Sequence, residues 1–157
     1  MKIAFWSIGK QHDPSMKEAI TAYTARIQKY APISWEIIPV LKHAGQLNEQ
    51  EVKKREGRMI LDKLDPDTIL VALDEKGKQL SSVQLADFLV KRANMATKKL
   101  VFLIGGAFGI DQSVLDKADL VWSLSQLTFP HQLVRILLAE QVYRAYTIIK
   151  NEKYHHS

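Results

Sequence analysis

Two stretches of the sequence carry residues that could do chemistry. The first is LVFLIGGAFGID (100–111), in which an apolar run leads directly into Gly105 and Gly106, with Gly109 shortly after. Glycine costs backbone entropy on folding, so glycines gathered at a strand end indicate either a tight turn or the close approach of a ligand to the backbone. Both alternatives stay open on the sequence alone.

The spacing of these glycines argues against two nucleotide-binding motifs. The dinucleotide fingerprint needs Gly-x-Gly-x-x-Gly, but Ala107 stands where the second glycine should be. The acidic residue expected about 20 positions later, after a further strand, is also missing. No Gly-Lys-Ser/Thr follows, so a phosphate-binding loop is excluded as well. A nicotinamide-dependent enzyme is therefore a distant alternative.

The second stretch is SLSQLTFPHQLVRILLAEQVYRAY (123–146). Pro130 suits the first turn of a helix, where its missing N–H costs nothing. His131 and Arg135 are then four residues apart and share one face near the helix N-terminus, at the end expected to meet a ligand cleft. They are either a functional pair or a capped helix start with a solvated arginine.

The rest of this helix, expected over 130–149, is nearly surrounded by apolar residues. Such a helix must be buried in the core or at a subunit interface, which favours a homodimer. Glu140 and Arg144 form a second pair at a spacing of four, and we interpret them as a surface ion pair.

The chain ends in KNEKYHHS, a short basic and aromatic segment. Chain ends are usually disordered, and that is the ordinary interpretation. Alternatively, Tyr154, His155 and His156 could stack on a base while Lys150 and Lys153 contact phosphates. The two histidines have no acidic or cysteine companions nearby, so no metal site is expected.

Strand-like and helix-like patterns alternate along the whole chain. The nearly continuous apolar character of the strands predicts an α/β fold with a mostly parallel sheet and helices on both faces. The expected strands are 2–9, 34–40, 68–74, 98–106 and 120–125, and the expected helices are 14–30, 47–64, 81–95, 112–118 and 130–149. Ser81 and Gln84 are spaced as a capping box at the start of the helix expected over 81–95.

In such sheets, ligands bind beyond the carboxyl ends of the strands. Three strand ends in the second half of the chain therefore matter: Leu73-Asp74, Gly105-Gly106 and Leu124-Ser125.

The chain has 157 residues, a formal net charge of +5 and a sequence pI of about 9.4. Its length predicts a single domain over 1–157. The positive charge favours an anionic partner such as nucleic acid, although many proteins carry such a charge for solubility alone. There is no cysteine, no apolar run long enough to span a membrane and no secretion signal, so we expect a cytoplasmic protein without disulfides.

Four segments together carry a specific resemblance. Leu73-Asp74 with Gly77-Lys78, then IGGAFG, then SLSQLTFPHQLVRILLAEQVYRA, and finally KYHH resemble the RlmH family of bacterial ribosomal RNA large subunit methyltransferases, which are of the SPOUT class. The resemblance covers essentially the whole chain. It implies a methyltransferase that uses S-adenosylmethionine to methylate N3 of a pseudouridine in 23S ribosomal RNA. Because a dimer of 157-residue chains offers little surface for reading RNA sequence, we expect it to act on the assembled ribosome.

The resemblance also implies structural features that the residue pattern does not. These are an α/β knot, with a trefoil in the C-terminal half, and a homodimer that packs the final helices together, with each tail near the partner's site. The residues implied to hold the cofactor are Leu73, Gly105, Leu124, Ser125, Gln126, Leu127, Thr128 and Phe129. In this interpretation Gly105 and Gly106 keep side chains away from the bound cofactor.

The same resemblance suggests catalytic and substrate-binding roles. Removal of the weakly acidic N3 proton needs a base or a stabilising positive charge. His131 could accept that proton or orient the base, and Arg135 could stabilise charge. Tyr154, His155 and His156 could hold the nucleotide, from their own or the partner subunit. The alternatives are a non-enzymatic RNA-binding module and a SPOUT methyltransferase with another RNA target.

Overall fold

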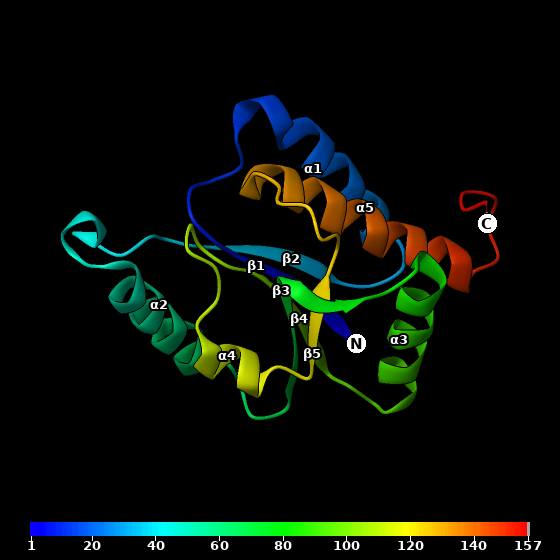
Figure 1. Ribbon diagram of the computed structural model, residues 1–157. Coiled ribbons are helices and arrows are strands. Elements are labelled where there is room, and N and C mark those ends of the chain that lie inside the picture. The colour runs from blue at the N-terminus through cyan, green and yellow to red at the C-terminus, as the bar shows by residue number, and fades with distance from the viewer. Residues whose placement is uncertain (157) are drawn as a thin grey trace.

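Five parallel strands form the centre of the computed structural model, which describes residues 1–156 (Figure 1). Their order across the sheet is β2-β1-β4-β3-β5, and every pair of neighbours runs parallel. The strands are β1 (Lys2–Ile8), β2 (Ile33–Ile38), β3 (Thr68–Gln79), β4 (Lys99–Ile104) and β5 (Leu120–Ser123). The predicted strands and their parallel arrangement are confirmed, but β3 continues to Gln79 instead of ending at residue 74.

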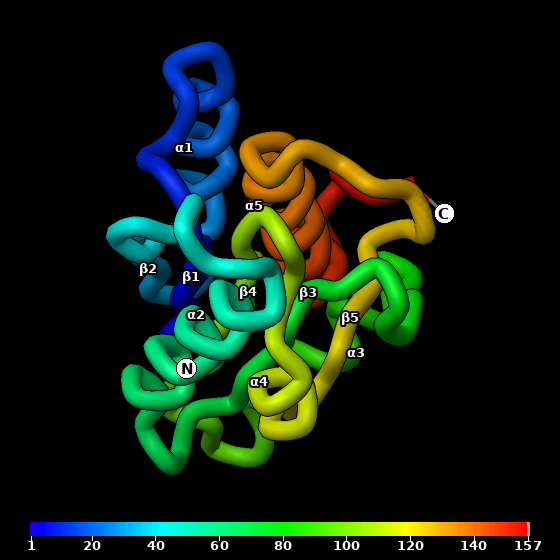
Figure 2. The backbone as a smooth tube through the Cα atoms, turned by 60° about the vertical axis from the view of Figure 1, so that its left-hand side comes forward, coloured from blue at the N-terminus to red at the C-terminus, as the bar shows by residue number. Residues whose placement is uncertain are grey.

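Helices cover both faces of the sheet, as expected (Figures 1 and 2). One layer contains α1 (Pro14–Gln28), α3 (Ser82–Asn94) and α5 (His131–Ile149), and the other contains α2 (Glu49–Lys63) and α4 (Gln112–Lys117). A short 3₁₀ helix, η1 (Ala44–Gln46), precedes α2 and was not expected from the sequence. The layers give the fold two cores, one on each side of the sheet.

The central strands are buried on both faces. In β1, Ile3 and Phe5 belong to the core under α1, α3 and α5, whereas Ala4, Trp6 and Ile8 belong to the core under α2 and α4. Side chains alternate between the faces of a strand, so a strand covered on both sides must be apolar at consecutive positions. This explains why the sequence shows unbroken apolar runs.

Local side chains begin the helices. The Asp13 carboxylate accepts from the Ser15 N–H at 3.0 Å, and Pro14 follows at the first helical position of α1. The Ser81 hydroxyl accepts from the Gln84 N–H while the Gln84 amide oxygen accepts from the Ser81 N–H, which completes the predicted capping box of α3. Helix starts with such local signals are the ones that the sequence predicts well.

The final helix is packed between α1 and α3 in the core. Its completely buried apolar residues include Leu138, Val142 and Ala145. Burial in the core, one of the two alternatives for this apolar helix, is therefore confirmed. Within residues 1–156, no helix is both long and apolar enough to cross a membrane. The trefoil knot implied by the resemblance stays a prediction.

A break in register shapes the β3–β5 pair. Leu73 and Lys78 both pair with Trp122, so the residues between them bulge out of the ladder. A Cβ atom on Gly77 would lie 2.6 Å from the Val121 carbonyl oxygen. Only glycine lets the returning part of β3 come this close to the backbone of β5.

We therefore expect Gly77→Ala to destabilise the fold, since neither backbone can move away without breaking the ladder. The melting temperature should fall by roughly 2–8 °C in a thermal unfolding scan. Gly45→Ala is the matched control, because a Cβ atom at Gly45 would meet no atom within 4 Å. Equal melting temperatures for the two variants would contradict this account of the bulge.

Candidate functional site

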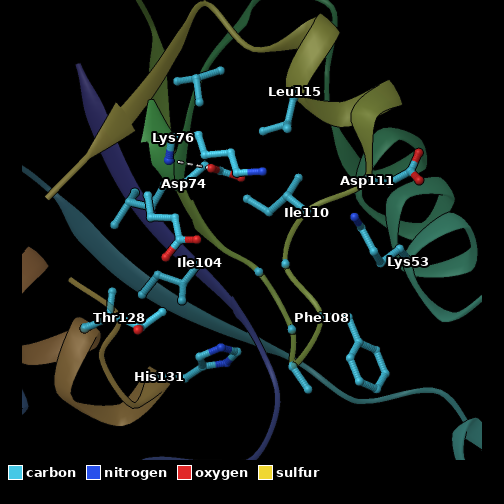
Figure 3. Close-up of a pocket in the computed structure, with 18 of the residues that line it drawn as sticks. Lys53, Asp74, Lys76, Ile104, Phe108, Ile110, Asp111, Leu115, Thr128 and His131 are labelled. Atoms are coloured by element: carbon cyan, nitrogen blue, oxygen red, sulfur yellow. Dashed lines mark hydrogen bonds between the residues drawn. The ribbon is translucent and has the colours of Figure 1, made fainter. Parts of the chain in front are cut away.

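A pocket of about 1060 Å³ opens at the bulge of β3 and the carboxyl ends of β4 and β5 (Figure 3). The three strand ends singled out in the sequence, Leu73-Asp74, Gly105-Gly106 and Leu124-Ser125, all line it. Parallel neighbours bring their carboxyl ends to the same edge of a sheet, and here that edge also meets the start of α5. The pocket is therefore built by the topology of the sheet.

Most residues that the resemblance assigned to the cofactor line this pocket. They are Leu73, Gly105, Leu124, Ser125, Leu127, Thr128 and Phe129. Gln126 belongs to the same loop but is exposed and is not part of the lining. The structure thus brings together seven of the eight residues, and leaves Gln126 on the outside of the loop.

The glycine turn after β4 is held by the protein's own packing. A Cβ atom on Gly105 would lie 2.6 Å from Cγ1 of Ile110, and one on Gly106 would lie 2.7 Å from Oε1 of Glu56. The Gly109 N–H donates to the Gly106 carbonyl at 3.1 Å, and Gly109 has a φ of +87°. The tight-turn alternative therefore accounts for these glycines, since protein atoms take the space that side chains would need.

Serine hydroxyls shape the loop between β5 and α5. The Ser123 hydroxyl donates to the Ser125 carbonyl at 2.9 Å, and the Ser125 hydroxyl accepts from the Leu127 N–H at 3.0 Å. The loop consequently turns back on itself and leaves the Leu127 side chain 69% exposed beside the pocket. Pro130 is the N-cap of α5, so the helix begins at His131, one residue later than predicted.

His131 is the first residue of α5 and lines the pocket (Figure 3). Burial lowers the pKa of its imidazole below the usual 6.5, and the nearby positive charge of Arg135 lowers the pKa further. The ring is therefore uncharged at neutral pH and has a free lone pair. A neutral imidazole in this position can accept a proton from a group bound in the pocket.

Arg135 lies one turn further along α5 but does not line the pocket. Its side chain is buried at 1% exposure, so the interpretation as a solvated arginine is wrong. The guanidinium donates to the Ser7 hydroxyl at 3.1 Å, to the Lys10 carbonyl at 2.8 Å and to Nδ1 of His12 at 3.2 Å. Arg135 thus fastens the start of α5 to the end of β1 and the loop that follows it.

No carboxylate is among these hydrogen-bond partners of Arg135, so its charge is stabilised by neutral groups alone. Burial lowers the pKa of the guanidinium, which nevertheless stays protonated because arginine titrates far above neutrality. The pKa of His12 is likewise lowered, first by burial and then by Arg135. The sequence could not reveal these contacts, because they join positions more than 120 residues apart.

Charged side chains from β3 and from the layer of α2 and α4 reach the pocket. Asp74 accepts from the Lys76 N–H at 2.8 Å in the bulge of β3, and Asp111 begins α4 on the other side (Figure 3). Glu49 and Lys53 come from the first turns of α2. The two α2 residues were not predicted from the sequence, because a charged helix face gives no signal that distinguishes a pocket wall from a solvated surface.

The C-terminal segment folds back onto α5 at the end of the helix far from the pocket (Figure 1). The Tyr154 ring packs edge-on against Tyr143 with centroids 4.7 Å apart, and its hydroxyl donates to Glu140 at 3.1 Å. His155 is within 3.4 Å of Arg144. The ordinary expectation of a disordered tail is therefore wrong for residues up to 156.

Glu140 and Arg144 do form the predicted ion pair, although it is partly buried beneath the tail instead of lying on the surface. Glu140, the hydrogen-bond partner of Tyr154, lies nine residues along α5 from His131, which is about 14 Å at 1.5 Å per residue. Tyr154, His155 and His156 do not line the pocket of the same chain. No group of three side chains that could hold a metal ion occurs in residues 1–156.

Comparisons with known proteins agree with this geometry. Residues 1–155 match the family described as predicted SPOUT methyltransferase. The chain is 44% identical to ribosomal RNA large subunit methyltransferase H of Trichlorobacter lovleyi, covering 99% of this chain and 100% of that protein. It is 43% and 40% identical to the proteins of the same name from Parabacteroides distasonis and Bacillus pumilus, with 99% of each chain covered. The chain belongs to the SPOUT methyltransferase family.

Proposed function

We propose that this protein uses S-adenosylmethionine to methylate N3 of a pseudouridine in the 23S RNA of the large ribosomal subunit. The observation that carries the proposal is the pocket at the bulge of β3 and the ends of β4 and β5, whose lining includes seven residues assigned to the cofactor by resemblance. The names of the relatives support a ribosomal RNA substrate. An enzyme acting on ribosomes works in the cytoplasm.

The residues of the pocket suit this cofactor chemically. Its apolar walls include Leu73, Ile104 and Ile110, which can enclose an adenine ring. The carboxylates of Asp74 and Glu49 offer partners for a molecule that carries a positive sulfonium and an ammonium group. The cofactor, when bound, supplies a methyl group activated by the sulfonium.

We assign His131 as the group that accepts the N3 proton of the target base. It is the neutral imidazole of the pocket, and its lowered pKa keeps it ready to accept a proton. Arg135 then acts through His131 and not on the substrate, because its guanidinium faces Ser7, Lys10 and His12. Its buried positive charge opposes protonation of His131 before the reaction and keeps the first turn of α5 in place.

The position of the tail supports a homodimer. Tyr154 is held beside Glu140 and Tyr143 and does not line the pocket that contains His131 in one chain, so a site that uses both residues takes Tyr154 from a second copy. In the proposed dimer, the tail of one subunit reaches the pocket of its partner and holds the nucleotide. The target is recognised on the assembled ribosome, since this single domain offers little surface for reading RNA sequence.

The cofactor can be tested by calorimetric titration of the protein with S-adenosylmethionine. We expect saturable binding that weakens at least about tenfold in Thr128→Trp, because the indole would occupy the pocket from an exposed loop position without disturbing the core. Met95→Trp is the matched control, since Met95 is 60% exposed and outside the pocket. If the folded protein does not bind the cofactor, a non-enzymatic RNA-binding module becomes the better interpretation.

The role of His131 can be tested by kinetics on ribosomes that lack the modification, with mass spectrometry of the 23S RNA to locate the new methyl group. His131→Ala should lower kcat at least about a hundredfold while cofactor affinity stays nearly unchanged. In the wild-type enzyme, kcat should fall only when the pH drops below the pKa of His131, which is lowered from its usual value of 6.5. A methyl group on another nucleotide would identify a SPOUT enzyme with a different target.

Arg135→Met should move this acidic limb of the pH–rate profile to higher pH. Removing the positive charge raises the pKa of His131, so the imidazole becomes protonated, and inactive as a base, at a less acidic pH. Circular dichroism would establish that the variant is folded. An unchanged acidic limb in the folded variant would contradict a role through His131.

Subunit complementation tests the tail. His131→Ala and Tyr154→Ala should each be nearly inactive alone, but a mixture allowed to exchange subunits should regain about a quarter of the wild-type activity. Half of the dimers in such a mixture are mixed, and each mixed dimer has one site with both residues intact. No recovery in mixtures shown to contain mixed dimers would mean that Tyr154 does not act across subunits.

A further inference from the structure

Glu56 is a buried carboxyl group that the proposed mechanism does not use. It lies on α2 at 4% exposure, and its Oε1 has no hydrogen-bond partner within residues 1–156. Burial raises the pKa of this carboxyl. A buried polar atom without a hydrogen-bond partner destabilises the folded state, so a leucine of similar volume would be more stable at this position. The presence of a carboxyl group here therefore needs an explanation.

The carboxyl group lies directly against the glycine turn. A Cβ atom on Gly106 would be 2.7 Å from Oε1 and 2.9 Å from Oε2 of Glu56. Gly106 lines the pocket, whereas Glu56 does not. The backbone of the turn is thus the wall between the Glu56 carboxyl and the pocket.

Glu56 cannot easily withdraw from this position. A Cβ atom on the next residue, Gly57, would lie 3.0 Å from Cβ of Asp111 and 3.3 Å from Cγ2 of Val114. This close approach fixes α2 against α4, and α4 follows directly on the glycine turn along the chain. The backbone that carries Glu56 is therefore held on one side by α4 while its carboxyl group meets the turn on the other.

We propose that Glu56 is a positioning residue for the methyl-donor site: its carboxyl group fills the space behind Gly106 and sets where the backbone of Gly105 and Gly106 borders the pocket. This inference rests on the proposed function, because it concerns the same pocket. Gly106 and Glu56 form a complementary pair, in which the missing side chain of one makes room for the carboxyl group of the other.

The pair can be tested by four variants titrated with S-adenosylmethionine: Glu56→Gln, Glu56→Ala, Gly106→Ala and the double variant Glu56→Ala/Gly106→Ala. Glu56→Gln keeps the shape, so its Kd should stay within about twofold of the wild type. Each single alanine variant should bind at least about tenfold more weakly. In Glu56→Ala the turn loses the carboxyl group that supports it, and in Gly106→Ala the new methyl group collides with that carboxyl group. The double variant should bind more tightly than either, because the new methyl group enters the vacated space.

Hydrogen exchange of residues 105–110 provides an independent readout. Exchange should speed up in Glu56→Ala and slow down again in the double variant. Glu18→Ala, at an exposed position on α1, is the control and should change neither exchange nor affinity. If Glu56→Ala does not fold, Glu56→Asp, which withdraws the carboxyl by one methylene, replaces it in both the single and the double variant.

The outcomes separate this inference from the proposed function. Failure of the folded wild-type protein to bind S-adenosylmethionine would contradict the proposed function. Two outcomes would overturn the role of Glu56 while leaving the proposed function intact, provided that the wild type binds S-adenosylmethionine. One is an unchanged Kd in Glu56→Ala. The other is a double variant whose loss of affinity equals the product of the losses in the two single variants. Tighter binding by the double variant than by either single variant would support it.

Discussion

The pocket depends on one close packing arrangement, in which side chains from two directions occupy the space beside the bare backbone after β4. Ile110 takes the place that a side chain on Gly105 would need, and Glu56 takes the place beside Gly106. The turn can therefore reverse tightly at the edge of the sheet, so that the chain enters α4 while its backbone faces the ends of β3 and β5. Any side chain at these two positions would have to push α2 or the start of α4 outward.

Arg135 makes a second connection of a different kind. Its guanidinium stabilises the loop after β1 through a hydroxyl, a carbonyl and an imidazole, without a carboxylate partner. A buried cation compensated only by neutral dipoles leaves a positive potential in its surroundings. Burial lowers the pKa of His131, at the neighbouring turn of α5, and this potential lowers the pKa further. The interaction that anchors the helix thus also helps to keep the imidazole that faces the pocket uncharged.

The sequence predicted the features that depend on local or periodic patterns. Continuous apolar runs predicted buried parallel strands, and Ser81 with Gln84 predicted a helix start, because both signals lie within a few residues. The carboxyl ends of the strands then located the pocket. Features that depend on packing between distant segments were not predicted: the continuation of β3 beside β5, the burial of Arg135 and the folded tail.

Glu56 shows why such features are hard to predict. Glu56 is one of many charged residues in α2, and their pattern predicts a helix face exposed to solvent. Glu56 differs from the others only because the glycine turn lies against it in the folded protein. The glycines themselves were noticed, but the sequence could not show whether a ligand or the protein fills the space beside them. The space beside Gly106 is filled by Glu56, which lies 50 positions earlier in the chain.

The C-terminal tail lies apart from the pocket of its own chain. Tyr154 is held by Tyr143, Arg144 and Glu140, which fixes it beside the second half of α5 and outside the lining of the pocket. His131, at the start of the same rigid helix, cannot approach it. If His131 and Tyr154 act on one nucleotide, the site must therefore be completed by the tail of a second chain. In such a pair, the helix that organises the core of each subunit would also set the distance between the two sites.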